Sequence, residues 1–281
     1  MSRRNRELHV PRPPATPAAA HRLLQQGNAA FARLVATAPH DTPTLIPLLS
    51  ADAGSFGRGA PRSQEPFAAV LGCSDARVPL EIIFQQACND LFVVRVAGNI
   101  LTSEGLGSLD FAATAFARCL RLLVVLGHTR CGAVTAAVDA FLAPMEYLHL
   151  APSQPLRGVL DRLFIAVRAA DRSLREVHGP HADNSPGYRA ALIECSVILN
   201  AALTAHTLAR ELGEGEHHER EIVFGIYDLE SLGVWSPPSR ATQTPRALPG
   251  MASPPATPAA FRSLGKTVAR MPRVLALLDA A

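Results

Sequence analysis

The sequence predicts an α/β fold, with a central, mostly parallel β-sheet that is flanked by helices and preceded by an N-terminal helical arm. Two observations support this class. Four short runs are almost entirely apolar, as expected for strands that are covered on both faces. Between them lie longer stretches whose apolar residues recur three and four positions apart, as on one face of a helix. Strands that alternate with helices form sheets that are at least partly parallel.

Each element follows from its local pattern, beginning with the arm, where apolar side chains at helical spacing predict a helix at residues 21–34. The four apolar runs predict strands at residues 67–71, 91–96, 120–126 and 221–227. The periodic stretches predict helices at residues 106–119, 129–142, 160–177 and 188–212. Ser108 is a candidate N-cap of the first of these helices. Residues 261–278 are periodic again, but Gly265 and Pro272 interrupt them and predict a weak terminal helix.

The composition favours a folded protein with basic, proline-rich ends. The chain of 281 residues is 48% hydrophobic and 18% charged, so it can bury a sizeable core. Seven of the 23 prolines lie before residue 48 and seven lie between residues 237 and 258. The net charge is +3, yet residues 23–235 carry 16 basic and 22 acidic side chains. The excess positive charge therefore belongs to the ends, and it does not indicate an anionic partner for the body.

The cysteine count and the hydropathy pattern exclude several classes of protein. Five cysteines are an odd number and too few for a disulfide scaffold, so free thiols or metal ligands in a reducing compartment are expected. The longest aliphatic stretch, residues 120–126, contains Arg121 and is far shorter than the roughly 20 residues of a membrane span. The arginine pair at residues 3–4 is not followed by an apolar segment of the kind that export signals need. We expect a cytoplasmic protein with no membrane partner.

Side chains that bind metals follow two of the predicted strands. Cys73 comes after the first strand, and His128 and Cys131 come after the third. The carboxyl ends of parallel strands meet at one edge of a sheet, so these side chains should converge there. Two thiolates and an imidazole are a zinc donor set, and three protein ligands with one open position are typical of catalytic sites. The alternative is that both cysteines are small core residues and that His128 is a turn histidine.

A charged pair lies two and four residues after Cys73. Asp75 can complete a tetrahedral metal site or accept a hydrogen bond from a zinc-bound water, and Arg77 can hold the carboxylate ionised. The alternative is an ordinary salt bridge within a loop, which contributes little.

Three segments in this order resemble the β-class carbonic anhydrases. They read CSDARV at residues 73–78, FVVRVAGN at residues 92–99 and GHTRCGAV at residues 127–134. The resemblance extends to Gly27-Asn28 in the arm and covers about residues 21–235. It implies a catalytic domain at residues 21–235. A proline- and arginine-rich arm at residues 1–20, poorly ordered, precedes this domain, and a proline-rich extension with a possible terminal helix follows at residues 236–281.

The resemblance implies one zinc ion per chain on Cys73, His128 and Cys131, with Asp75 and Arg77 as the catalytic dyad. It implies that the enzyme is a lyase that hydrates carbon dioxide reversibly to bicarbonate and a proton, through zinc-bound hydroxide that the dyad orients. The resemblance allows two states of the site: a closed one, found in some family members, in which Asp75 would be the fourth zinc ligand, and an open one in which Asp75 pairs with Arg77. The resemblance also implies a homo-oligomer, either a dimer or a tetramer.

The substrate-binding candidates are Gln86, Gly98, Asn99 and Gly132. Residues 85–91 depart from the family pattern, which commonly has Asp-Gln and a glycine-containing turn here, although Asn89 can replace a glycine of positive φ. The turn at residues 230–233 also departs from a usual Thr-Gly turn, and this departure concerns the last hairpin or strand and not the metal site. The other three cysteines are expected to be bystanders without a ligand partner: Cys88, Cys119 and Cys195.

Three other functions compete with this interpretation. One is a zinc-containing binding module of the same fold without activity, but the intact Asp75 and Arg77 argue against it. Hydrolysis of a carbon dioxide analogue such as carbonyl sulfide would use the same residues. Nucleic-acid binding by the arginine-rich ends around a structural zinc is disfavoured, because the ends lack the interleaved aromatic residues of single-strand binders and a closed four-ligand set is missing.

Overall fold

A five-stranded sheet lies at the centre of the described part of the chain. The structure, a computed structural model, describes residues 13–37, 63–213, 220–238 and 250–280. The strand order is β2-β1-β3-β4-β5, and the first four of these strands pair in parallel while β5 pairs antiparallel with β4. The bounds are β1 Ala68–Gly72, β2 Leu91–Arg95, β3 Leu122–His128, β4 Glu221–Tyr227 and β5 Val234–Trp235. The predicted α/β class with a mostly parallel sheet is confirmed.

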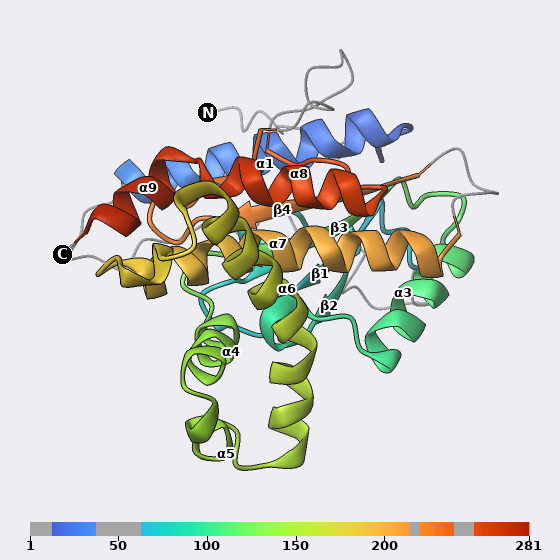
Figure 1. Ribbon diagram of the computed structural model, residues 1–281. Helices are drawn as coiled ribbons and strands as arrows, with labels where there is room; N and C mark the ends of the chain where they lie inside the picture. The colour runs from blue at the N-terminus through green and yellow to red at the C-terminus, as the bar shows by residue number, and fades with distance from the viewer. Residues whose placement is uncertain (1–12, 38–62, 214–219, 239–249, 281) are drawn as a thin grey trace.

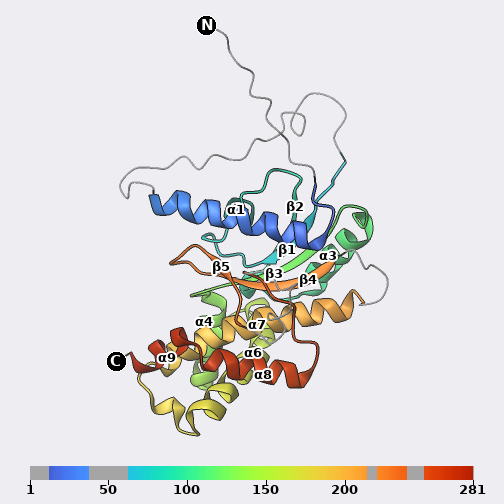
Figure 2. The same ribbon diagram turned by 90° about the horizontal axis from the view of Figure 1, so that it is seen from above.

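Helices cover both faces of this sheet. Their bounds are α1 Pro17–Thr37, α2 Leu80–Ile83, α3 Ser103–Ala115, α4 Gly132–Leu142, α5 Tyr147–Leu150, α6 Gln154–His178, α7 Tyr188–Glu211, α8 Pro258–Ala269 and α9 Pro272–Asp279. Figure 1 shows the whole chain, and Figure 2 shows α1 on one side of the sheet and α4, α6, α7, α8 and α9 on the other. The N-terminal and C-terminal helices therefore lie on opposite faces.

The alternation of side chains along β3 divides the core into two clusters. Leu122 and Val124 pack with side chains of α1, whereas Leu123 and Val125 pack with side chains of α7. Every residue of β3 is buried, which explains why its sequence is continuously apolar rather than alternating. Helix α7 is long and apolar enough to cross a membrane, but most of it is buried inside the fold, as befits a core helix.

Several predicted bounds and one predicted cap are corrected. Helix α3 begins at Ser103, and its N-cap is Thr102, whose hydroxyl accepts a hydrogen bond from Gly105 N at 3.1 Å. Ser108 is therefore not the N-cap: it lies within the helix and donates its hydroxyl to Glu104 O at 2.9 Å. The hydroxyl of Thr102 satisfies a free amide of the first turn, and no such amide remains at Ser108.

The two ends of the chain also differ from the predicted bounds. Helix α1 begins at Pro17, since proline is well tolerated in the first turn, and residues 1–12 of the predicted arm lie outside the described residues. The weak terminal helix is two helices, because Pro272 starts α9, while Gly265 lies inside α8. Helices α8 and α9 pack on α6 and α7. The division of the chain at residues 20 and 235 stays a prediction.

Helix α1 approaches α2 closely at Gly27. A Cβ atom on Gly27 would lie 1.8 Å from Phe84 O, so only glycine fits this crossing. Gly27→Ala is expected to lower the free energy of unfolding by about 1–3 kcal/mol, because backbone must move to admit the methyl group. Urea denaturation measures this change. Gly107→Ala is the matched control, since a Cβ atom on Gly107 would meet no described residue within 4 Å beyond its chain neighbours and the backbone of its own helix. Equal stability of the two variants would contradict the close approach.

Burial of His21 on α1 predicts a loss of stability in mild acid. Its pKa is lowered from 6.5 to about 4, because burial disfavours the charged imidazolium. Below pH 6.5 the unfolded chain binds a proton that the folded chain does not, so the free energy of unfolding falls by about 1.4 kcal/mol per pH unit down to about pH 4. Urea denaturation of the wild type and His21→Leu between pH 7 and pH 4.5 isolates this effect. A difference between them that does not change with pH would exclude it.

Candidate metal centre

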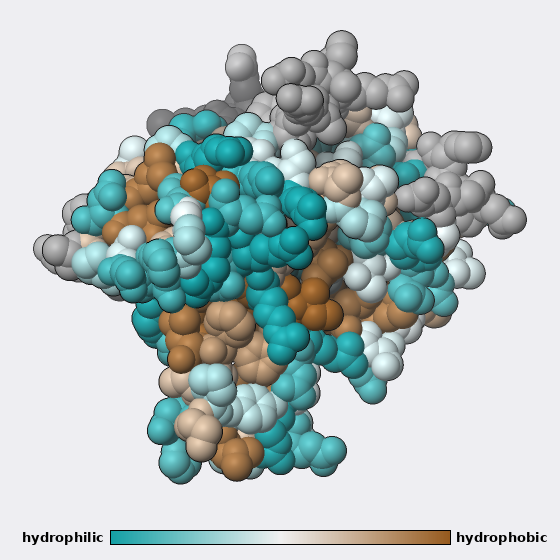
Figure 3. Space-filling model, in the orientation of Figure 1, coloured by the Kyte–Doolittle hydropathy of each residue, from teal (hydrophilic) through white to brown (hydrophobic). Residues whose placement is uncertain are grey.

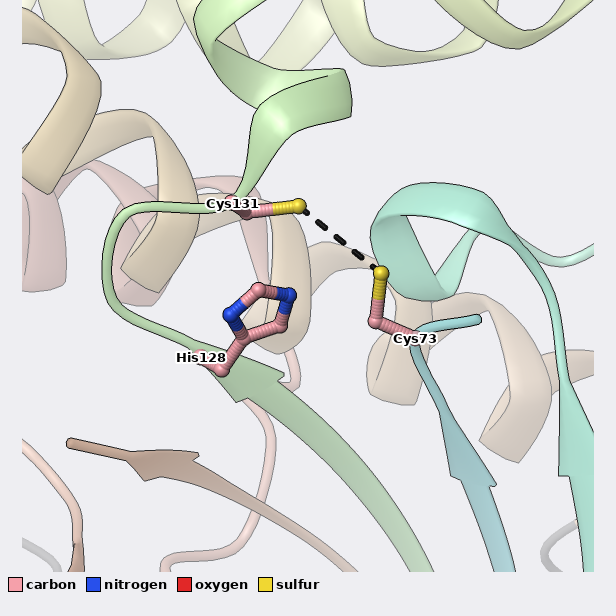
Figure 4. A group of neighbouring side chains, drawn as sticks. All are labelled: Cys73, His128 and Cys131. Carbon is pink, nitrogen blue, oxygen red and sulfur yellow. Dashed lines mark hydrogen bonds between the residues drawn. The ribbon is translucent and has the colours of Figure 1, made fainter. Parts of the chain in front are cut away.

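The three predicted ligands meet at the carboxyl edge of the sheet. Cys73 directly follows β1, His128 ends β3, and Cys131 is the N-cap of α4. Because β1 and β3 are parallel neighbours, with Gly72 opposite Leu126, both strands end at the same edge. Figure 4 shows the three side chains pointing toward one another. Their ligand atoms all lie within 4.8 Å of one another, and the two sulfur atoms are 3.9 Å apart.

This geometry fits a zinc ion. Two thiolates at about 2.3 Å from a tetrahedral zinc stand about 3.8 Å apart, whereas a disulfide requires about 2.05 Å. The Nδ1 atom of His128 lies 3.0 Å from Thr129 O and therefore carries the ring proton. The Nε2 atom is buried and has no hydrogen-bond partner among the described residues. A buried imidazole nitrogen with a free lone pair is costly unless it binds something, and a metal ion satisfies it.

The thiols are electrostatically coupled. The pKa of Cys73 is lowered by hydrogen bonding with the Cys131 thiol, against the effect of burial, and Gly98 N, 3.3 Å from its sulfur, also stabilises the thiolate. The pKa of Cys131 is raised by its contact with Cys73 and by burial. The Cys73 thiolate therefore forms readily, and its negative charge opposes ionisation of the Cys131 thiol. A cation between the two sulfurs is what would allow both to ionise.

Asp75 and Arg77 form a two-pronged ion pair beside the ligands. Arg77 Nε donates to Asp75 Oδ1 at 2.9 Å and Arg77 Nη2 donates to Oδ2 at 2.6 Å. These hydrogen bonds lower the pKa of Asp75 to about 2, although burial opposes the shift. Asp75 Oδ2 lies 3.9 Å from His128 Nε2. The carboxylate is therefore ionised, oriented by Arg77 and near the imidazole nitrogen that is free to bind a metal.

Two residues that sequence reasoning missed hold this arrangement. Arg95, at the end of β2, donates to the backbone carbonyls of Cys73 at 2.9 Å and Asp75 at 2.5 Å. Thr129 fixes the histidine tautomer through its carbonyl oxygen. The only sequence feature that could have indicated the role of Arg95 is its position as a charged residue within the otherwise apolar second strand. Backbone hydrogen bonds such as that of Thr129 leave no trace in the sequence.

Three of the four substrate-binding candidates lie near the ligands. Gly98 has φ of 66° and binds the Cys73 sulfur through its amide, and its carbonyl accepts a hydrogen bond from Asn200 Nδ2 at 2.7 Å. Asn99 follows with φ of 45° and a buried Nδ2 that has no partner in the described part of the chain. Gly132 starts α4 beside Cys131, and, apart from its chain neighbours and the backbone of its own helix, no described residue lies within 4 Å of the position that a Cβ would take.

Gln86 lies elsewhere in this chain. Its Nε2 donates to Phe84 O at 2.6 Å and lies against Gly27, where α1 crosses α2. Its side chain therefore contributes to helix packing, and a role toward substrate stays a prediction. Asn89 has φ of 77°, so the prediction that it replaces a glycine in the following turn is confirmed.

Comparison with known proteins decides the family. The family described as carbonic anhydrase matches residues 68–232, more than half of the chain. The chain belongs to the carbonic anhydrase family. The resemblance to the β class is thereby confirmed, and the match includes all three candidate ligands and the Asp75–Arg77 pair. Helices α8 and α9 lie outside it.

Individual carbonic anhydrases resemble parts of the chain. Carbonic anhydrase 2 of Mycobacterium tuberculosis is 42% identical over 128 residues, which are 46% of this chain and 56% of that protein. The carbonic anhydrase of Pseudomonas aeruginosa is 34% identical over 182 residues, 60% of this chain and 71% of that protein. The chain thus spans little more than half the length of the first relative. The solved structure of the β-carbonic anhydrase CcaA has a TM-score of 0.46 and 25% identity over 63% of this chain and 81% of its own.

Proposed function

We propose that this protein catalyses the zinc-dependent, reversible hydration of carbon dioxide to bicarbonate and a proton. The observation that carries the proposal is the buried Cys73, His128 and Cys131 donor set with an ionised Asp75 at its edge. A zinc ion held by these three residues would supply the Lewis acidity that makes water a nucleophile near neutral pH. Membership in the carbonic anhydrase family supports the same reaction.

The residues around the donor set have separate tasks. Asp75 has a pKa of about 2, which makes its carboxylate too weak a base to remove a proton near neutral pH. Its task is to accept a hydrogen bond and so to orient the attacking water. Arg77 keeps that carboxylate ionised and fixes its plane through two hydrogen bonds. Thr129 keeps the His128 proton on Nδ1, so that Nε2 faces the metal position.

Stopped-flow carbon dioxide hydration at pH 8 with a pH indicator, combined with metal analysis, tests this proposal. We expect one zinc ion per chain and a rate far above the uncatalysed rate. A zinc-replete wild type without activity would overturn the enzymatic proposal and favour the inactive binding module. Release of sulfide from carbonyl sulfide at a higher kcat/KM than carbon dioxide hydration would favour the analogue hydrolase.

We propose that the protein is a homo-oligomer, a dimer or a tetramer, in the cytoplasm. Exposed apolar side chains on the lobe of α4, α5 and α6, among them Met145, Leu148 and Ile165, support an oligomer. Figure 3 shows brown, apolar residues on this lobe, at the bottom of the view. Thiolate ligands without disulfides support a reducing compartment. Light scattering after size exclusion measures the mass, and a monomer at micromolar concentration would contradict the oligomer.

A further inference from the structure

Helix α9 brings one arginine to the turn that follows β4. Arg273 Nε lies 2.7 Å from Glu194 Oε1 on α7, and Arg273 Nη2 donates to Asp228 Oδ2 at 2.9 Å. The guanidinium carbon lies 4.6 Å from the centroid of the Trp235 ring on β5. A single cation from outside the carbonic anhydrase match therefore joins α7, the residue after β4, and β5.

Of the two carboxylates that Arg273 bridges, Glu194 is buried and Asp228 is partly buried. The side chains of Glu194 and Asp228 are 8% and 13% exposed. Burial raises the pKa of Glu194, and Arg273 acts against that shift. Removing one partner of a buried ion pair leaves an uncompensated charge, which strongly destabilises the local structure. Without Arg273, the carboxylates of Glu194 on α7 and Asp228 after β4 would lose the cation that lies between them.

Asp228 organises that turn with its other oxygen. Asp228 Oδ1 accepts hydrogen bonds from Glu230 N at 2.8 Å and from Ser231 N at 3.3 Å. From the opposite face of the sheet, Asn28 on α1 accepts a hydrogen bond from Val234 N at 2.7 Å. The turn is thus held on one side by α1 and on the other by Arg273.

The residues on either side of Asp228 bind Thr129. Tyr227 O accepts a hydrogen bond from Thr129 N at 3.0 Å, and Leu229 N donates to Thr129 Oγ1 at 3.0 Å. Thr129 O in turn lies 3.0 Å from His128 Nδ1. A continuous path of hydrogen bonds and backbone therefore runs from Arg273 through Asp228 and Thr129 to the candidate ligand His128.

A second contact, which does not involve Arg273, holds helix α9 against the residue before α7. A Cβ atom on Gly187, just before α7, would lie 1.7 Å from Leu277 O, so the helix rests directly on the glycine backbone. Gly187 thus offers a way to displace α9 that leaves the Arg273 side chain intact.

We propose that Arg273 is a positioning residue of the metal centre: from a helix outside the carbonic anhydrase match it fixes Asp228 and, through Thr129, the ring of His128. The inference rests on the zinc site of the proposed function, but not on carbon dioxide as the substrate. Residues that orient a metal ligand commonly contribute 10–100-fold to metal affinity, and Arg273 is expected to act at about the lower end of this range.

Arg273→Met tests the proposal, because methionine keeps an apolar stem against Trp235 but has no charge. Transfer of zinc from the full-length protein to the chelator 4-(2-pyridylazo)resorcinol is expected to become about tenfold faster. The thiolate-to-cobalt and d–d absorption bands of the cobalt(II)-substituted protein are expected to shift, because the imidazole changes its orientation. Gly187→Ala is expected to change both readouts in the same direction. Lys266→Met is the matched control, since it removes an ion pair between α8 and α6, in which Lys266 Nζ lies 3.2 Å from Glu176 Oε2, and leaves Arg273 and Asp228 unchanged.

Asp228→Asn completes a double-mutant cycle. If Arg273 acts through Asp228, zinc transfer from the double variant is expected to be no faster than from the more severe single variant. Effects that simply multiply would overturn the proposal, as would identical transfer rates and cobalt spectra in Arg273→Met and Lys266→Met. A wild type that binds neither metal overturns both this inference and the proposed function. A wild type that binds zinc but does not hydrate carbon dioxide overturns the proposed function alone.

Discussion

His128→Ala is expected to abolish zinc binding and carbon dioxide hydration together. The imidazole supplies one of three donor atoms that lie within 4.8 Å of one another, and its Nε2 is buried. Two thiolates alone would leave two of the four coordination positions of a zinc ion to water. We expect less than about 0.1 zinc per chain and a kcat/KM that is lower by at least about 10³-fold, since the metal supplies the nucleophile. Cys73→Ser is expected to give the same result.

Metal analysis and stopped-flow hydration measure this prediction, and a matched histidine controls it. His149 is exposed and pairs with Glu146 at 2.9 Å, away from the ligand cluster. His149→Ala is expected to retain zinc and rate. Circular dichroism distinguishes loss of the metal from loss of the fold. A folded His128→Ala variant with a full equivalent of zinc would refute the assignment of this residue as a ligand.

The parallel strands could be predicted because strands that are buried on both faces consist of continuous apolar runs. Strand β4 has the predicted bounds, and β1, β2 and β3 differ from them by no more than two residues. Strand β5 was not predicted, since it has only two residues and forms by pairing Val234 and Trp235 with Tyr227 and Ile226 of β4. Helices α2 and α5 have four residues each, too few for a periodic pattern to develop.

The candidate ligands could be predicted because their chemistry lies in the side-chain types themselves. Cys73, His128 and Cys131 follow strand ends, and topology alone brings strand ends together. The residues that orient them could not be predicted in the same way. Arg95 binds backbone carbonyls, which every residue has, and Arg273 reaches Asp228 across 45 positions of the chain. Contacts of this kind are properties of packing and not of local sequence.

Asp75→Asn is expected to retain zinc and to lose most of the turnover. Asparagine has the same shape, so the turn after β1 is expected to keep its place. The asparagine amide, however, carries no charge, and one of its two polar atoms is a hydrogen-bond donor. In the wild type both are acceptors, and one of them, Asp75 Oδ2, lies 3.9 Å from His128 Nε2. Arg77 then loses its two-pronged partner, and the attacking water loses its acceptor. We expect one zinc per chain and a kcat/KM that is lower by about 10²–10³-fold, as when a positioned polar group at a reacting centre is removed.

Asp139→Asn is the matched control for this variant. Asp139 forms a similar two-pronged pair with Arg189, at 2.6 Å and 2.8 Å, between α4 and the first turn of α7. Asp139→Asn shows how much kcat/KM changes when a two-pronged ion pair outside the metal centre is lost. We expect its kcat/KM to stay within about twofold of the wild-type value, because exposed ion pairs contribute little. Wild-type kcat/KM in Asp75→Asn would show that the carboxylate is not needed for turnover. Zinc loss from Asp75→Asn, with zinc retained in Asp139→Asn, would instead identify Asp75 as a metal ligand. The zinc content of Asp75→Asn therefore distinguishes an Asp75 that only orients water from an Asp75 that closes the site by binding zinc.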